Sequence, residues 1–447
     1  MSSAPLSFAK IRCAALIGLS EGLAAFDETS LGVVLPTLQQ DFSVSAGATH
    51  WVVNVYLVVM ASLVAACGRS ADFVPADRLW RLGVVIFIVT SVAAGAAPGI
   101  DWLIAVRAVQ GVGSALMFAT GIVLIGQIFG DEERGRAFGI LASLATFMLV
   151  LGPIAGGLLT EFLSWRWVFW VAVPPALLCL FGFKSPVPLK RPAGKRRSLD
   201  LPGFAALTVS IAALSVALMQ GPDWGWGSPT ILGLFVVAVA SGLSFLRIEA
   251  KSPAPLIDLA LFRNRSVAAA LMTSFMAQYR RVGTSIYLAL YLRDGLGLSP
   301  FLAGLALLPT LIVLPIATVL VGQIADRVGA RKVILVGIAA IGAASYWIAL
   351  ATDLGSYWVL LPGLVLVTFF APTMFGPPRK SMLHDLPATL HAQASGVSVT
   401  ASMLGSTLAI SIGSVLLTMT GASWPIFLAM GLLLTALWLV AYRWLGR

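Results

Sequence analysis

Residues 11–36 read IRCAALIGLSEGLAAFDETSLGVVLP, an apolar run that is long enough to cross a lipid bilayer. Asp27 and Glu28 lie in its interior, and Glu21 lies earlier in the same run. A charge at bilayer depth costs roughly 2.5–3.5 kcal/mol on insertion scales. Acids at this depth usually face a bundle interior or a water-filled cavity, where they bind ions or relay protons. The acids therefore predict a process linked to protons or ions inside a helical membrane protein.

The composition is that of a polytopic membrane protein. Of the 447 residues, 59% are hydrophobic and only 11% are charged, with a mean hydropathy of +0.94, whereas a soluble domain carries about 25% charged residues. The net charge of +10 would suit a nucleic-acid binder. However, the basic residues fall in short loops between apolar runs, which the positive-inside rule explains better. We expect an all-α protein whose surroundings are the lipid bilayer, with no nucleic-acid partner.

Fourteen stretches have the length and apolarity of a membrane span, since a span needs about 20 such residues. The first is no signal peptide, because it is too long, holds three acids and lacks a clear A-x-A site. In chain order the stretches run 12–36, 48–68, 80–98, 102–128, 138–160, 165–184, 200–220, 229–248, 266–292, 300–322, 331–352, 356–378, 390–418 and 424–444.

The positions of Lys and Arg predict the orientation of these spans. Arg166 and Arg293 fall in loops on one side, and Arg107, Arg280 and Arg281 fall within spans. The rest of the 29 Lys and Arg residues lie on the other side, in the loops, the tails and the span ends that adjoin them. Both termini are therefore expected in the cytoplasm, with the protein in a bacterial-type plasma (inner) membrane.

Few residues could support enzymatic or metal chemistry. Cys13, Cys67 and Cys179 are widely spaced, and His50, His384 and His391 form no cluster. The cysteines have the character of small buried hydrophobes. A G-x-x-x-x-G-K-[ST] phosphate loop is absent from the sequence. We expect neither an enzyme nor a cofactor or metal, so that energy for any work must come from an ion gradient.

An internal repeat organises the chain. Gly68-Arg69-Ser70-Ala71-Asp72 recurs as Gly322-Gln323-Ile324-Ala325-Asp326, and the same shift maps Asp27 onto Arg281. Repeats of this kind place the substrate near the midplane between two equivalent halves. The expected parts are an N-terminal six-helix half, a basic cytoplasmic linker, an inserted helix pair and a C-terminal six-helix half, at residues 1–185, 186–199, 200–250 and 265–447.

Several motifs, in order along the chain, resemble those of the major facilitator superfamily, in particular its fourteen-helix branch of drug:proton antiporters. The first-helix stretch 26–36 contains an aspartate, a threonine and a following Leu-Pro, and residues 51–56 continue the likeness. Residues 107–113 match R-x-x-Q-G-x-G, and residues 152–157 match the antiporter motif G-P-x-x-G-G. The resemblance covers nearly the whole length and implies a major facilitator fold with 14 transmembrane helices.

The resemblance implies roles for individual residues in the first half. Asp27 would be the membrane-embedded proton site, with Glu28 beside it and Arg107 taking part in proton transfer. A carboxyl group removed from water can load and release protons near neutral pH. The alternative is a purely structural ion pair of Asp27 with Arg107. The motif at Gly152, Pro153, Gly156 and Gly157 would belong to conformational switching, and its alternative is ordinary close packing through small residues.

The repeated loop is similar to the family motif G-x-L-A-D-R-x-G-R-[RK], which latches the halves on the cytoplasmic side. The second copy is well preserved, while the first departs at Phe73, Pro75 and Ala76. Loop charges that only orient the helices are the alternative. The switching residues expected here are Gly68, Asp72, Gly322, Asp326 and Arg327.

Gln278, Arg280 and Arg281 lie in the middle of the ninth stretch, where the resemblance predicts no charge. They could form an ion pair with the first half, hold an anionic or zwitterionic substrate, or pair statically with nearby carbonyls or acids. The residues expected to face a substrate cavity are Glu21, Asn54, Tyr56, Gln110, Gln278, Arg280 and Arg281.

Together these features predict a secondary active transporter that exports drugs or small organic molecules by alternating access, coupled to protons. The alternative is an exporter or permease for an anionic or zwitterionic metabolite. A membrane enzyme or a channel fits less well. The partners of the predicted transporter would be a small-molecule substrate and protons, and we expect a monomer.

Overall fold

The computed structural model describes residues 7–71, 73–189, 201–252, 264–384, 386 and 391–444. Within these ranges the chain is helical and contains no strand, which confirms the all-α prediction. The chain divides into two compact units, one of residues 1–199 with Ser299–Gly304 and the other of residues 200–298 with 305–447.

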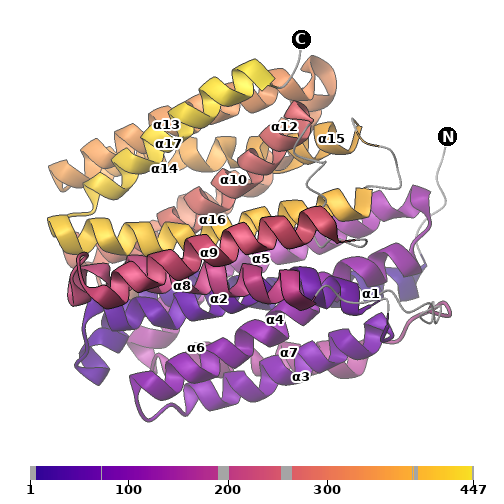
Figure 1. The fold of residues 1–447 in the computed structure, drawn as a ribbon, viewed down its shortest axis with the longest axis horizontal. Coiled ribbons are helices and arrows are strands. Elements are labelled where there is room, and N and C mark those ends of the chain that lie inside the picture. Colours follow the sequence, from indigo (N-terminus) through magenta and orange to yellow (C-terminus); the bar gives the residue numbers. More distant parts are fainter. Residues whose placement is uncertain are drawn as a thin grey trace. The chain divides into compact units, whose positions relative to one another are not determined.

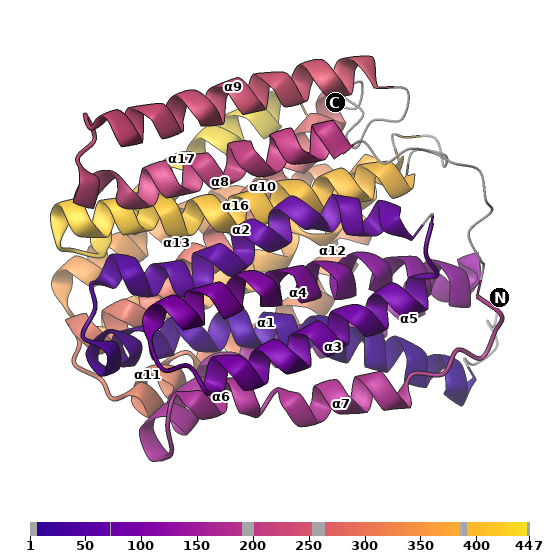
Figure 2. The same cartoon turned by 60° about the horizontal axis from the view of Figure 1, so that its bottom comes forward.

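Long helices that run alongside one another make up the first unit (Figures 1 and 2). Its helices are α1 (Phe8–Phe42), α2 (Ala46–Ser70), α3 (Ala76–Gly95), α4 (Ile100–Ile128), α5 (Asp131–Phe162), α6 (Arg166–Trp170), α7 (Val173–Gly182) and the first residues of α11 (Pro300–Ala306). α1 is buried along most of its length, from Cys13 to Leu38, because α2, α4, α5 and α7 pack around it.

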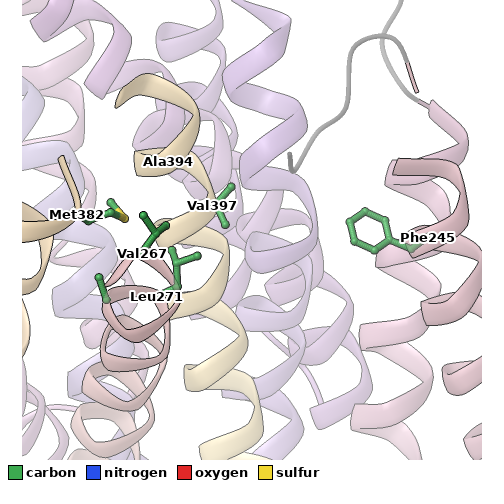
Figure 3. Close-up of a cluster of buried hydrophobic side chains, with 7 residues drawn as sticks. Phe245, Val267, Leu271, Met382, Ala394 and Val397 are labelled. Atoms are coloured by element: carbon green, nitrogen blue, oxygen red, sulfur yellow. The ribbon is translucent and has the colours of Figure 1, made fainter. Parts of the chain in front are cut away.

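The second unit contains the remaining helices of the described chain and a small cluster of buried hydrophobic side chains around α10. They are α8 (Leu201–Trp224), α9 (Pro229–Lys251), α10 (Arg265–Leu290), η2 (Tyr291–Gly295), α12 (Leu308–Val328), α13 (Ala330–Leu354), α14 (Tyr357–Phe370), η3 (Ala371–Met374), α15 (Gly376–His384), α16 (His391–Thr420) and α17 (Trp424–Trp444). α8 packs against α16 on one side and against α9 on the other. Figure 3 shows the buried cluster, which consists of Phe245, Val267, Ala270, Leu271, Met382, Ala394 and Val397.

Prolines break three of the predicted spans. Pro174 and Pro175 lack the N–H groups that would bond the carbonyls of residues 170 and 171, and α6 gives way to α7 there. Pro309 follows the break between α11 and α12, and Pro372 lies where α14 tightens into the 3₁₀ turn η3. The predicted stretches 165–184, 300–322 and 356–378 are therefore each more than one helical segment.

Nine helical segments within the described ranges are long and apolar enough to cross a membrane by composition. Three shorter apolar stretches accompany them, at Arg166–Gly182, Pro202–Leu218 and Leu404–Thr420. α1 and α10, which carry buried charges, are not among the nine. The chain is thus a polytopic membrane protein, and the count of fourteen spans stays a prediction.

Glycines bring the helices of the first unit into backbone contact. A Cβ on Gly18 of α1 would lie 2.7 Å from the Cα of Leu141 in α5, and one on Gly156 of α5 would lie 2.9 Å from the carbonyl of Ser30 in α1. A Cβ on Gly111 of α4 would lie 2.7 Å from the carbonyl oxygen of Tyr56 in α2. Such close approach is how membrane helices associate where the surrounding lipid is as apolar as the side chains. It holds α1, which carries Asp27, against α5, and it holds α4, which carries Arg107, against α2.

Candidate functional site

Asp27 and Arg107 form a buried ion pair between α1 and α4. Nη1 of Arg107 donates to Oδ2 of Asp27, and the exposed fractions are 2% for Asp27 and 0% for Arg107. Breaking a buried pair by removing one partner typically costs about 3–5 kcal/mol, because the other charge remains without compensation. Each of the two groups therefore depends on the other for compensation of its charge.

The guanidinium of Arg107 also holds three further groups. Its Nε donates to the carbonyl of Val52 at 2.9 Å, and its Nη1 donates to Oε1 of Gln110 at 2.7 Å. The ring of Tyr56 lies under it, 4.2 Å from ring centroid to Cζ. A cation over an aromatic face is stabilised by the ring quadrupole, and more so out of water. Arg107 therefore keeps three contacts that do not depend on the charge of Asp27.

A polar chain continues from this pair into α3. Nε2 of Gln110 donates to Oγ of Ser91 at 3.1 Å, and both side chains are fully buried. The amide of Gln110 is thereby oriented with its oxygen toward Arg107. Residues of four helices, α1 to α4, meet at this point, and we call Asp27, Arg107, Gln110, Ser91 and Tyr56 the charge cluster.

Two other acids of α1, Glu28 and Glu21, are buried, one beside Asp27 and the other further along the helix. Glu28 is 8% exposed and lies close enough to Asp27 for their charges to interact. Glu21 is 7% exposed, and its Oε1 lies 3.1 Å from the position that a Cβ on Gly121 of α4 would take. It precedes Asp27 by six positions, which corresponds to about 9 Å along a helix. Asn54 is completely buried in α2.

The motif at residues 152–157 forms the seam between α1 and α5. A Cβ on Gly152 would lie 2.1 Å from Oγ1 of Thr29, and one on Gly157 would lie 2.3 Å from the carbonyl of Pro300 at the start of α11. Oγ1 of Thr29 is 2.8 Å from the carbonyl of Leu149. The glycines of this motif are therefore required for contact with α1 on one side and with residues 300–301 on the other.

In the second unit the predicted cavity residues lie on α10. Nε of Arg281 donates to Oε1 of Gln278 at 2.5 Å, and Arg280 is 5% exposed. α10 packs closely on α16, because a Cβ on Gly405 would lie 2.1 Å from the carbonyl of Phe275. The opposite charges of Asp27 and Arg281 at repeat-related positions thus each have a partner within their own unit, and a pairing of the two stays a prediction.

The loop-motif residues are described only in part. A Cβ on Gly68 would have Ala119 as its nearest neighbour, at 3.8 Å, and one on Gly322 would face open space. Arg327 is exposed. Asp72 and the side chain of Asp326 lie outside the described residues, as does the linker from residue 190 to 200. The latch function of these loops stays a prediction.

Sequence reasoning missed the backbone groups of the site. The carbonyls of Val52 and Leu149 are acceptors for Arg107 and Thr29, and Ser91 orients Gln110. One signal was available, since Pro153 lacks an N–H and therefore predicts a free carbonyl four residues earlier, at Leu149. Val52 and Ser91 carry no comparable signal.

Similarity to known proteins covers almost the whole chain. The family model described as Major Facilitator Superfamily matches residues 17–410 and 270–447. A methylenomycin A resistance protein of Bacillus subtilis is 29% identical over 409 residues, which are 90% of this chain and 86% of that protein. The multidrug resistance protein Stp of Mycobacterium tuberculosis is 32% identical over 403 residues, 89% of this chain and 74% of that protein.

Two further comparisons agree with these. A tetracenomycin C resistance and export protein of Streptomyces glaucescens is 29% identical over 401 residues, 88% of this chain and 73% of that protein. Among solved structures, the crystal structure of a POT family transporter in complex with a thioalcohol-conjugated peptide has a TM-score of 0.71 at 13% identity, with 96% of this chain and 95% of that one covered. That likeness concerns the fold alone.

Proposed function

The chain belongs to the Major Facilitator Superfamily, and on that premise we propose that it is a secondary active transporter that exports drugs or similar organic molecules in exchange for protons. The observation that carries the proton coupling is the buried pair of Asp27 and Arg107. The names of three relatives, for methylenomycin A resistance, multidrug resistance, and tetracenomycin C resistance and export, support the direction and the class of substrate.

The charge cluster provides a route from proton binding to conformational change. A proton on Asp27 cancels the negative charge and removes the attraction that joins α1 to Arg107. Arg107 keeps the Val52 carbonyl, Gln110 and the ring of Tyr56, so that it stays with α2 and α4 while α1 is released. The relative free energies of the two access states then change with the protonation of one carboxyl. A proton that moves inward down a 100 mV potential supplies about 2.3 kcal/mol for this change.

The finer assignment is to the fourteen-helix branch of drug:proton antiporters. It is supported by the motif at residues 152–157 and by the helix pair α8–α9. This pair lies between the two repeated halves in the sequence and belongs to the second compact unit. We further propose a monomer in the inner membrane with both termini in the cytoplasm, and no cofactor other than the proton gradient. Gly68, Asp72, Gly322, Asp326 and Arg327 are proposed to act in switching at the cytoplasmic side.

A second candidate function is the export of an anionic or zwitterionic metabolite. It is favoured by Arg280 and Arg281, two adjacent cations inside α10 of which the first is almost fully buried. In this case Gln278 and Arg281 would contact the substrate, and a contribution of Glu21 and Asn54 to its binding stays a prediction.

A susceptibility panel separates the two candidates. Strains that overproduce the wild type, Asp27→Asn or Arg281→Ala are grown with methylenomycin A, puromycin, tetracenomycin C, lipophilic cations and organic acids. Drug export predicts resistance to some of the drugs, lost in Asp27→Asn and reduced for every substrate in Arg281→Ala. Metabolite export predicts tolerance only of acids, with loss confined to acidic compounds in Arg281→Ala. No altered tolerance to any compound would contradict both.

A further inference from the structure

Pro153 leaves a carbonyl of α5 without its helical donor. In an α-helix the N–H of residue 153 would bond the carbonyl of Leu149, and proline has no N–H. α5 nevertheless continues without interruption from Asp131 to Phe162. A buried backbone carbonyl in a membrane protein needs another donor, because no water replaces the missing bond.

Thr29 of α1 supplies that donor. Its Oγ1 lies 2.8 Å from the carbonyl oxygen of Leu149, and Thr29 is 4% exposed. Gly152 makes the contact possible, because a Cβ at that position would lie 2.1 Å from the Oγ1 of Thr29. Two neighbouring residues of α5 thus cooperate, since Pro153 frees the carbonyl and Gly152 admits the hydroxyl.

The hydroxyl of Thr29 also has two acceptors within its own helix, the carbonyl of Ala25 and, more distant at 3.4 Å, that of Phe26. The carbonyl of Ala25 lies 2.9 Å from Oγ1, nearly as close as that of Leu149. A hydroxyl carries one proton, so it bonds either α5 or its own helix at any moment. Thr29 follows the proposed proton site, Asp27, by two residues on the same helix.

We propose that Thr29 is a positioning residue that ties α1 to the proline break in α5, and that exchange of its hydrogen bond between Leu149 and Ala25 accompanies each movement of α1 in the transport cycle. This inference rests on the proposed transport function. It deepens that function by linking the motif of α5 to the proton site through one hydroxyl group, which is neither a proton carrier nor a substrate ligand.

The test is a double-mutant cycle of Thr29 with Pro153. Thr29→Val keeps the shape of the side chain and removes the donor, Thr29→Ser retains the donor, and Pro153→Ala restores an N–H for the carbonyl of Leu149. Thr120→Val is the matched control, because Thr120 is also a buried threonine, and among the described residues its hydroxyl bonds only the carbonyl of Leu116 in its own helix. Thermal unfolding, substrate affinity and turnover are measured on each purified protein.

Thr29→Val is expected to lower turnover by about 3- to 10-fold, the effect of about one net hydrogen bond, with substrate affinity unchanged. Thr29→Ser should retain at least half of the wild-type turnover, and Thr120→Val should match the wild type. In the Pro153→Ala background, Thr29→Val should have less than half of its effect on both turnover and unfolding temperature, because the backbone N–H of the introduced alanine supplies the donor.

Two results would overturn the inference. Equal effects of Thr29→Val in both backgrounds would mean that the hydroxyl does not replace the donor that Pro153 lacks. An unchanged turnover in Thr29→Val would mean that the bond has no part in the cycle, and a lowered unfolding temperature beside it would make the bond structural only. The double-mutant cycle measured by thermal unfolding requires no transport. It therefore tests the hydrogen bond between Thr29 and Leu149 even if the protein proves not to be a drug exporter.

Discussion

At the scale of single residues, the protein buries two opposite charges, Asp27 and Arg107, almost completely and lets each compensate the other. Asp27 was predictable from the sequence, because an acid within an apolar run needs a functional or structural reason. Its partner was predictable as one of two alternatives, Arg107 or Arg281, and the contact within the first unit is with Arg107. Sequence alone could not identify the Val52 carbonyl or Ser91, since backbone groups and small polar side chains occur everywhere.

The first prediction concerns the compensation between these charges. Asp27→Asn leaves the guanidinium of Arg107 buried without a counter-charge and should destabilise the protein by about 3–5 kcal/mol. The double variant Asp27→Asn with Arg107→Gln removes both charges and should recover most of that stability, while transport remains absent. Thermal unfolding in detergent and drug uptake into everted vesicles measure the two effects. Additive destabilisation in the double variant would show that the two charges are not energetically coupled.

At the scale of helices, close contact between backbones fixes the site, and glycine positions decide it. The repeat and the apolar runs predicted where helices occur. The observed helix ends differ from the predicted ones where prolines interrupt the backbone hydrogen bonds, as at Pro174 and Pro309. The partners of each helix were not predictable, because lipid-facing and buried stretches are equally apolar. The seam between α1 and α5 became visible only from the distances around its glycines.

Two glycines of α5 should respond differently to the same substitution. Gly152→Ala places a methyl group 2.1 Å from Oγ1 of Thr29 and 2.9 Å from the carbonyl of Phe26, so α1 and α5 must separate. Overpacking of this kind typically costs about 1–3 kcal/mol. Gly139→Ala on the same helix meets nothing within 4 Å and should be neutral or stabilising by up to about 1 kcal/mol. Thermal unfolding of the two variants measures the difference, and similar values for both would contradict the seam.

The first turns of α1 and α5 are joined by an ion pair that should give a small pH dependence. Nζ of Lys10 lies 2.5 Å from Oε2 of Glu133, and this hydrogen bond holds the pKa of Glu133 below its usual value. A lowered pKa in the folded state contributes stability above the unfolded pKa of about 4.3, and that stability is lost as the pH falls through the folded pKa.

Glu133→Gln should therefore unfold at a slightly lower temperature than the wild type at pH 7, and the difference should vanish below about pH 4. Lys10→Met should show the same loss at pH 7, and the double variant should lose no more than either single one. Unfolding temperatures measured across pH provide the check. A difference that persists unchanged at low pH would assign the effect to packing instead of charge.

At the scale of the whole molecule, the chain is a helical transporter of the Major Facilitator Superfamily, and it consists of two compact units. Composition was sufficient to predict the membrane, and the ordered motifs were sufficient to predict the family, because both depend on local sequence. The substrate was not predictable, since a few polar side chains such as Glu21 and Gln278 are compatible with several chemical classes.

Cysteine labelling tests the predicted topology of fourteen spans. In a background with Cys13, Cys67 and Cys179 replaced by alanine, Arg196→Cys should react with an impermeant maleimide only after the membrane is opened. Asp223→Cys should react in intact cells, because an odd number of spans separates the two positions in the predicted map. Labelling of both from outside would contradict fourteen spans with cytoplasmic termini.

The exchange of protons for a drug is the central claim, and proton flux measures it most directly. The purified protein is reconstituted into vesicles that contain a pH-sensitive dye, and the drug that gives the largest resistance in the susceptibility panel is added. We predict proton movement opposite to the drug, which starts on drug addition and is absent in Asp27→Asn. Drug transport without proton movement, or drug-driven proton movement at the wild-type rate in Asp27→Asn, would contradict the account.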